Sequence, residues 1–168
     1  ASDVYKRQLH EMMPHFDEPA SGPGGGQVDL EEYPIILTTG RRIPVYFHSE
    51  HRQLETSREF HPDPLFEMSP KAAEAAGLSE GDWCWLENHR GRCRQKLHVN
   101  PSLDDRVVRA EHGWWFPEEE PAFPHLYGAF ECNINNLTAS YETGYGGIGN
   151  PLKSIVCKIY KCTEDVDE

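Results

Sequence analysis

Residues 34–42 read Pro-Ile-Ile-Leu-Thr-Thr-Gly-Arg-Arg, a short apolar run followed by a glycine and two arginines. The run predicts a buried β-strand over 34–38 that stops at Thr39 and Gly40 and continues as a loop. A glycine at a strand end lets backbone N–H groups come close to a ligand, and the planar guanidinium of Arg41 can bind a phosphate. The stretch therefore predicts a strand leading into an anion-binding loop, and an ordinary exposed turn is the alternative.

The next residues continue this polar region. The segment 43–47 contains Pro44, so it is expected to be an edge strand or an irregular extended segment. His48, Ser49 and Arg52 then supply donors suited to heteroaromatic edges, carbonyls and phosphate oxygens. No H-E-x-x-H helix surrounds the histidines, so zinc is not predicted here. A solvated polar loop is the alternative.

The rest of the chain shows mostly strand and turn signals. A helix is predicted over 69–77, where serine can cap, proline suits the first turn and Gly77 can end it. A hairpin is predicted over 83–99, with Gly91 at a position that tolerates positive φ. Further strands are expected over 106–110 and 154–160. These elements predict a mainly β protein, a small barrel with one clear helix and long ligand-facing loops, the longest at 112–151.

Two further polar positions could contact a ligand. Asn135 lies in the run Asn133–Thr138, and an asparagine amide can read the edge of a purine or pterin, although such residues also close turns. Lys153 precedes the last predicted strand and could neutralise an anion, or could be a surface lysine.

Composition and charge exclude several classes of protein. The 168 residues carry a formal net charge of −12, but residues 33–162 account for only −3 of it, because the acids concentrate at the two ends. This region lacks the clustered Lys/Arg excess of nucleic-acid-binding proteins, and no apolar run is long enough for a membrane span. The five cysteines form no C-x-x-C pair, which favours buried free thiols over a zinc or iron–sulfur site. Hydrolase and phosphate-loop motifs are absent, so no catalytic or metal-ligating residue is predicted.

Three segments are expected along the chain. Residues 1–32 are predicted to form a flexible linker at the end of a preceding region, and the first eight resemble a sequence-assembly scar. Residues 33–162 form the predicted domain, and residues 163–168 an acidic tail. The leading linker and the lack of an initial methionine indicate a piece of a longer protein. A cytoplasmic location is expected, or a periplasmic one if an absent amino terminus carries an export signal.

Five ordered segments resemble the carboxy-terminal molybdopterin-dinucleotide-binding domain of the dimethyl sulfoxide reductase family of molybdenum and tungsten oxidoreductases. These segments are 36–52 (ILTTGRRIPVYFHSEHR), 61–96, 106–118 (RVVRAEHGWWFPE), 133–138 (NINNLT) and 149–161 (GNPLKSIVCKIYK). The resemblance implies a six-stranded double-psi β-barrel, similar to the aspartate decarboxylase barrel, with one or two short helices and long loops. It covers about residues 33–162.

The resemblance also implies a function. The domain would bind molybdopterin guanine dinucleotide, in the bis form with molybdenum or tungsten in the parent enzyme, and would not be active alone. The iron–sulfur and metal-ligating parts would lie elsewhere in that enzyme, and the partners would be its other domains and an iron–sulfur electron-transfer subunit. The implied cofactor-binding residues are Thr39, Gly40, Arg41, His48, Ser49, Arg52, Asn135 and Lys153.

Two alternatives remain open. The chain could be a free-standing cofactor-binding subunit. It could also be a non-enzymatic interaction barrel, in which Trp114, Trp115 and Phe116 anchor a partner protein.

Overall fold

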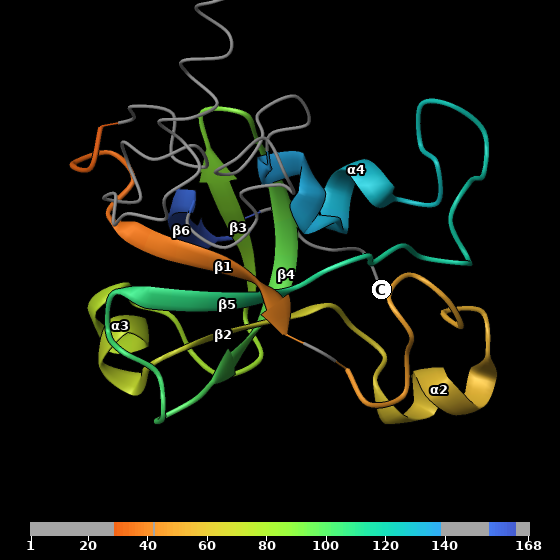
Figure 1. The fold of residues 1–168 in the computed structure, drawn as a ribbon, viewed down its shortest axis with the longest axis horizontal. Helices are drawn as coiled ribbons and strands as arrows, with labels where there is room; N and C mark the ends of the chain where they lie inside the picture. The colour runs from red at the N-terminus through yellow and green to blue at the C-terminus, as the bar shows by residue number, and fades with distance from the viewer. Residues whose placement is uncertain (1–28, 42, 139–154, 164–168) are drawn as a thin grey trace, which may run out of the picture.

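The computed structural model describes residues 29–41, 43–138 and 155–163, and this part of the chain forms a closed β-barrel (Figure 1). The order of strands around the barrel is β1-β5-β2-β4-β3-β6. The six strands are β1 (Ile35–Arg41), β2 (Leu65–Met68), β3 (Trp83–Asn88), β4 (Gly91–Val99), β5 (Val107–Glu111) and β6 (Ile155–Lys161). The predicted mainly β class and six-stranded barrel are confirmed.

The barrel combines parallel and antiparallel pairings. β1 pairs with β5, and β2 with β4, in parallel. The other four pairings are antiparallel, including the pairing of β1 with β6 that closes the barrel. Neighbouring parallel strands end at the same edge of a sheet, so the segments that follow β1 and β5 begin close together.

Short helices connect the strands. They are α2 (Glu55–Phe60), α3 (Pro70–Ala75), α4 (Ala129–Cys132) and the 3-10 helix η1 (Ile134–Leu137). The described residues thus hold three α-helices, where one or two were expected. None of these helices has the length and apolar character needed to span a membrane.

The structure confirms the helix predicted from residues 69–77. The Ser69 hydroxyl accepts a hydrogen bond from the Ala72 amide at 3.1 Å, and Pro70 occupies the first turn. Gly77, just beyond the helix, has a φ of +68°, a conformation that glycine adopts without strain. Local capping chemistry therefore sets both ends of α3.

Two apolar clusters stabilise the fold. The larger fills the barrel, with inward-facing side chains from all six strands, among them Leu37, Phe66, Leu86, Leu97, Val108 and Ile155. The smaller lies among the segments that follow β1 and β5 and combines Ile43, Tyr46, Trp114 and Cys132. Four of the five cysteines are buried free thiols, as predicted.

The burial of Trp114 corrects one expectation. Its side chain is completely inaccessible to solvent and packs in the smaller cluster. The adjacent Trp115 is only partly buried, and its Nε1 donates to the Ser49 carbonyl at 2.6 Å. Trp114 therefore stabilises this chain, and its burial removes it from the three aromatic residues proposed to anchor a partner protein.

The end of β1 also differs from the prediction. The strand does not stop at Thr39 but runs on to Arg41. Thr39 pairs with Ala110 and Arg41 with Glu111, so Gly40 is the extra residue of a β-bulge. The glycine keeps the strand paired while shifting its register, rather than ending the strand.

Two local predictions need correction or refinement. Residues 43–47 form neither an edge strand nor an extended segment: Pro44 and Val45 lie in a turn that the Tyr46 amide closes by donating to the Ile43 carbonyl at 3.2 Å. Gly91 lies in β4, opposite Asn88, and does not have a positive φ. A Cβ atom there would instead lie 3.1 Å from the Asn136 carbonyl oxygen. The close approach of η1, and not turn geometry, requires glycine at this position.

Candidate functional site

A pocket of about 170 Å³ lies where the neighbouring strands β1 and β5 end. Its polar lining comes from Arg41, the last residue of β1, from His48 in the following loop, and from His112, directly after β5. The apolar lining comes from Ile43, Tyr46 and Phe47. The pocket therefore combines one guanidinium, two imidazoles and aromatic surface, a set suited to a heteroaromatic ring that carries an anionic group.

Two loops meet at the mouth of this pocket, residues 47–54 after β1 and residues 112–116 after β5. The rings of His48 and His112 lie within hydrogen-bond distance, with 3.2 Å between Nδ1 and Nε2. Gly113 has a φ of +68°, and a Cβ atom there would lie 3.1–3.3 Å from backbone atoms of His48 and Ser49. The glycine thus lets the second loop lie directly against the backbone of the first.

Gly113→Ala is expected to lower the free energy of unfolding by about 2 kcal/mol, because alanine is strained at positive φ and its methyl group would push against residues 48 and 49. Gly77→Ala is the matched control, since Gly77 has the same φ of +68° with nothing within 4 Å of its Cβ position. We expect Gly77→Ala to lower the free energy of unfolding by about 1 kcal/mol. Urea denaturation followed by circular dichroism measures both. Equal losses would contradict the close packing of the two loops.

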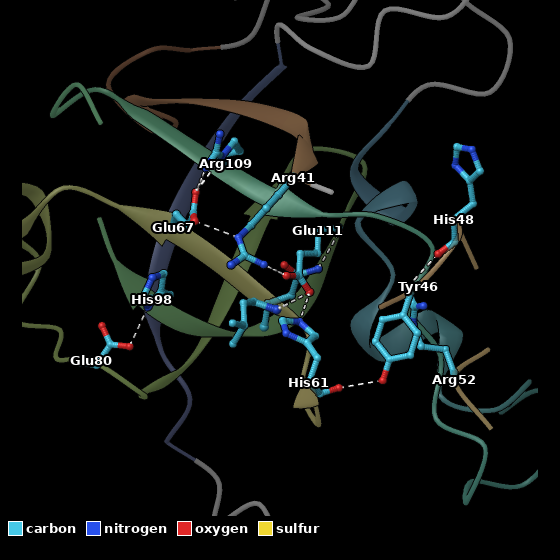
Figure 2. Close-up of polar contacts among 12 residues, drawn as sticks. Arg41, Tyr46, His48, Arg52, His61, Glu67, Glu80, His98, Arg109 and Glu111 are labelled. Carbon is cyan, nitrogen blue, oxygen red and sulfur yellow. Dashed lines mark hydrogen bonds and ion pairs between the residues drawn. The ribbon is translucent and has the colours of Figure 1, made fainter. Parts of the chain in front are cut away.

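A chain of charged side chains runs from the pocket along β1, β2 and β5 (Figure 2). The Arg41 guanidinium bonds to the Glu111 carboxylate and, through Nε, to Glu67 at 2.9 Å. Glu67 also pairs with Arg109, whose Nε lies 2.7 Å away. Glu111 is completely buried and further accepts hydrogen bonds from the Leu65 amide at 3.0 Å and His61 Nε2 at 2.9 Å. Two arginines thus balance two carboxylates.

This network shifts the pKa of its members. Burial alone would raise the pKa of Glu67, but hydrogen bonds from Arg41 and Arg109 outweigh it and the pKa is lowered. Burial, together with the positive charges of Arg41 and Arg52, lowers the pKa of His61 to about 4. His61 is therefore neutral at pH 7 and donates to Glu111 as an uncharged imidazole.

The depressed pKa of His61 predicts a loss of stability in mild acid. The unfolded chain binds a proton at this residue near pH 6.5 and the folded chain only near pH 4, so protonation favours unfolding as the pH falls between these values. Between these pH values the free energy of unfolding of the wild type is expected to fall by up to about 3 kcal/mol more than that of His61→Gln. The glutamine amide does not titrate and can still donate a hydrogen bond to Glu111. Denaturant titrations at a series of pH values measure the difference. Parallel profiles would contradict it.

The predicted site residues are placed as follows. Arg41 and His48 line the pocket, and Gly40 forms the bulge beside it. Thr39 is buried at a barrel-facing position of β1, and Ser49 is exposed in the loop after it. These five positions lie in β1 and the loop after it, and their roles in binding remain predictions.

Two predicted residues do not line the pocket, and a third lies outside the described part of the chain. Arg52 is completely buried beneath the loop, and its guanidinium does not line the pocket. Asn135 is exposed on η1, which packs on the β3–β4 hairpin through the bond from the Asn88 amide to the Leu137 carbonyl at 2.9 Å. Asn135 is not part of the pocket lining. Lys153 lies outside the described residues.

Sequence reasoning missed several residues of the site. Glu67 and Glu111 lie within strands that otherwise read as apolar or alternating, and an acid in such a strand signals a buried ion pair. Tyr46 and His112 gave no comparable signal, because their position depends on which loops meet.

Comparisons with known proteins give a consistent result. Residues 35–155 match a family model described as the molydopterin dinucleotide binding domain. The chain is 40% identical over 154 residues to a dopamine dehydroxylase from Eggerthella lenta, covering 91% of this chain and 15% of that protein. It is 32% identical over 165 residues to an acetylene hydratase from Syntrophotalea acetylenica, covering 96% and 23%.

A solved structure shows the same fold. The acetylene hydratase from Pelobacter acetylenicus superposes with a TM-score of 0.77 at 30% identity, covering 89% of this chain and 21% of that one. This chain thus spans less than a quarter of the length of these relatives.

Proposed function

Because the chain belongs to the molydopterin dinucleotide binding family, as a domain of the dimethyl sulfoxide reductase class of molybdoenzymes, we propose that its pocket at the ends of β1 and β5 holds part of that dinucleotide. The pocket lining carries the proposal: the Arg41 guanidinium, the paired imidazoles of His48 and His112 and the rings of Tyr46 and Phe47 converge there.

The donor set fits a group of this kind. A guanidinium and imidazole N–H groups bind phosphate and carbonyl oxygens, and the exposed ring of Phe47, accessible over 62% of its surface, can stack on a flat heterocycle. The volume of about 170 Å³ is smaller than the roughly 300–1,000 Å³ of pockets that enclose a whole small ligand. The pocket would therefore hold one portion of the dinucleotide, and other domains of the parent enzyme would hold the rest.

Five residues of this chain have proposed roles in binding the dinucleotide. The bulge at Gly40 gives close backbone approach, and Arg41 presents the part of its guanidinium that Glu67 and Glu111 leave accessible. His48 supplies a ring nitrogen from the loop. Asn135 and Lys153 remain proposed contacts for an edge and an anionic group of the same ligand.

We further propose guanine as the base of the dinucleotide and a bis-dinucleotide molybdenum or tungsten centre, with iron–sulfur clusters in other parts of the parent enzyme. The bound metal centre would supply the redox chemistry, while this domain binds and orients the cofactor. The substrates that name the relatives, dopamine and acetylene, suggest a small organic substrate selected by the other domains.

Titration of the 168-residue chain with guanosine 5′-diphosphate, followed by NMR, tests the proposal. We expect weak binding, with a Kd above about 1 μM, because a partial site leaves much of the association cost uncompensated. Shifts should concentrate at residues 40–49 and 112–113. His48→Ala should weaken binding at least about fivefold, and Glu74→Ala, an exposed change on α3, should leave it unchanged.

Three outcomes would contradict the proposal. They are shifts confined to another face of the barrel, no shifts with the wild-type chain, and equal affinity of His48→Ala and wild type.

A further inference from the structure

The loop that carries His48 has an unfavourable backbone conformation. His48 and His51 have φ values of 49° and 73°, in the left-handed region that residues other than glycine seldom adopt. Two such residues within four positions persist only where the surrounding structure holds them. The loop therefore needs a specific constraint.

Arg52 supplies hydrogen bonds to this loop. Its Nη2 donates to the His48 carbonyl at 2.9 Å (Figure 2). Its Nη1 donates to the Glu50 carbonyl at 3.2 Å. One guanidinium thus joins two carbonyls of the strained segment. The planar, forked arrangement of its donors makes this double contact possible.

Aromatic rings occupy the space beside the guanidinium. Its Cζ lies 3.9 Å from the centre of the Tyr46 ring and 4.6 Å from that of Trp114. The residue is completely buried, and none of the carboxylates in the described residues forms a salt bridge with it. Burial lowers its pKa to about 10, so it still carries its charge at pH 7. No accessible face is left for an anion from outside.

We propose that Arg52 is a positioning residue of the pocket: it fixes the carbonyls of His48 and Glu50 and so sets how Phe47 and His48 face the ligand. This role replaces the direct phosphate contact expected from the resemblance. It rests on the proposed function only for the identity of the ligand, because the constraint on the loop exists in the free chain.

Amide hydrogen exchange of the ligand-free chain tests the constraint. The Glu50 amide donates to the Phe47 carbonyl at 2.8 Å, and the Leu54 amide to the His51 carbonyl at 3.1 Å, so both report on the loop. In Arg52→Met and Arg52→Lys these amides should exchange at least about tenfold faster. The Leu97 amide, bonded to the Asp82 carbonyl in the barrel, should change less than twofold, a threshold of roughly the measurement error.

Arg58→Met is the matched control. Arg58 also lies near the Trp114 ring, at 5.8 Å, but its side chain pairs with Glu118 instead of the loop carbonyls. The control should leave the Glu50 and Leu54 rates unchanged. Unchanged rates in Arg52→Met, or equal acceleration at Leu97, would overturn the proposal.

Binding of guanosine 5′-diphosphate separates positioning from direct contact. Lysine keeps the charge but lacks the rigid planar fork whose separate nitrogens reach the two carbonyls and whose face stacks on the rings. We expect Arg52→Lys to bind at least about fivefold more weakly than wild type, like Arg52→Met. Affinity retained in Arg52→Lys and lost in Arg52→Met would indicate direct anion contact and overturn the proposal. If wild type does not bind, the proposed function fails, and the exchange rates alone decide the role of Arg52.

Discussion

Replacement of Arg41 by methionine is expected to lower the free energy of unfolding by about 3 kcal/mol or more. The change leaves the completely buried carboxylate of Glu111 without its guanidinium partner, and removing one member of a buried ion pair typically costs about 3–5 kcal/mol. The carboxylate of Glu67 is less affected, because it still forms an ion pair with Arg109. Chemical denaturation at pH 7 measures the loss.

The double variant Arg41→Met/Glu111→Gln identifies the cause. A neutral amide at position 111 leaves no uncompensated charge, so the double variant should recover at least about half of the loss. Arg106→Met is the control for an exposed pair. Arg106 and its partner Asp104 keep 78% and 55% of their side-chain surface accessible, and this variant should change stability by less than about 0.5 kcal/mol. A double variant no more stable than Arg41→Met would show that packing, not charge, is decisive.

The second large effect is expected for Trp114→Ala, at about 3–5 kcal/mol. The substitution removes a completely buried indole and leaves a cavity among Tyr46, Phe116 and Arg52. It also exposes the Arg52 guanidinium on one face. The same denaturation experiment measures the loss.

Trp115→Ala is the matched control, one residue away. Its partly buried ring packs against Tyr127 and makes one hydrogen bond to the Ser49 carbonyl, so we expect a loss of about 1–2 kcal/mol. Similar losses for the two variants would contradict the separate environments of the neighbouring tryptophans.

Local chemistry explains what the sequence predicted correctly. The capping serine and proline of α3, and the alternating residues of the β3–β4 hairpin, act through neighbours a few positions away. The continuation of β1 through a bulge at Gly40 could not be predicted in this way, because the hydrophobic pattern of a strand does not reveal one extra residue.

The site depends mostly on contacts between distant residues. Arg41 bonds to Glu111 seventy positions away, and Arg52 stacks on Trp114 after two intervening helices and four strands. A polar segment such as 48–52 predicts solvent exposure, so the burial of Arg52 could not be foreseen. The resemblance indicated candidate binding segments, whereas the structure distinguishes Arg41, which lines the pocket, from Arg52, which is completely buried.

The pairing of β1 with β6 has a consequence for biosynthesis. One of the two strands that pair with β1 is β6, the last strand of the barrel, with Ile35 opposite Cys157. A nascent chain must therefore emerge from the ribosome almost through residue 161 before the sheet can close. Until then, the edge of β1 that pairs with β6 stays open. Pairing between distant strands also slows folding, which prolongs this exposure. Chaperones that shield exposed strand edges should therefore matter most for this domain while its last strand is being translated.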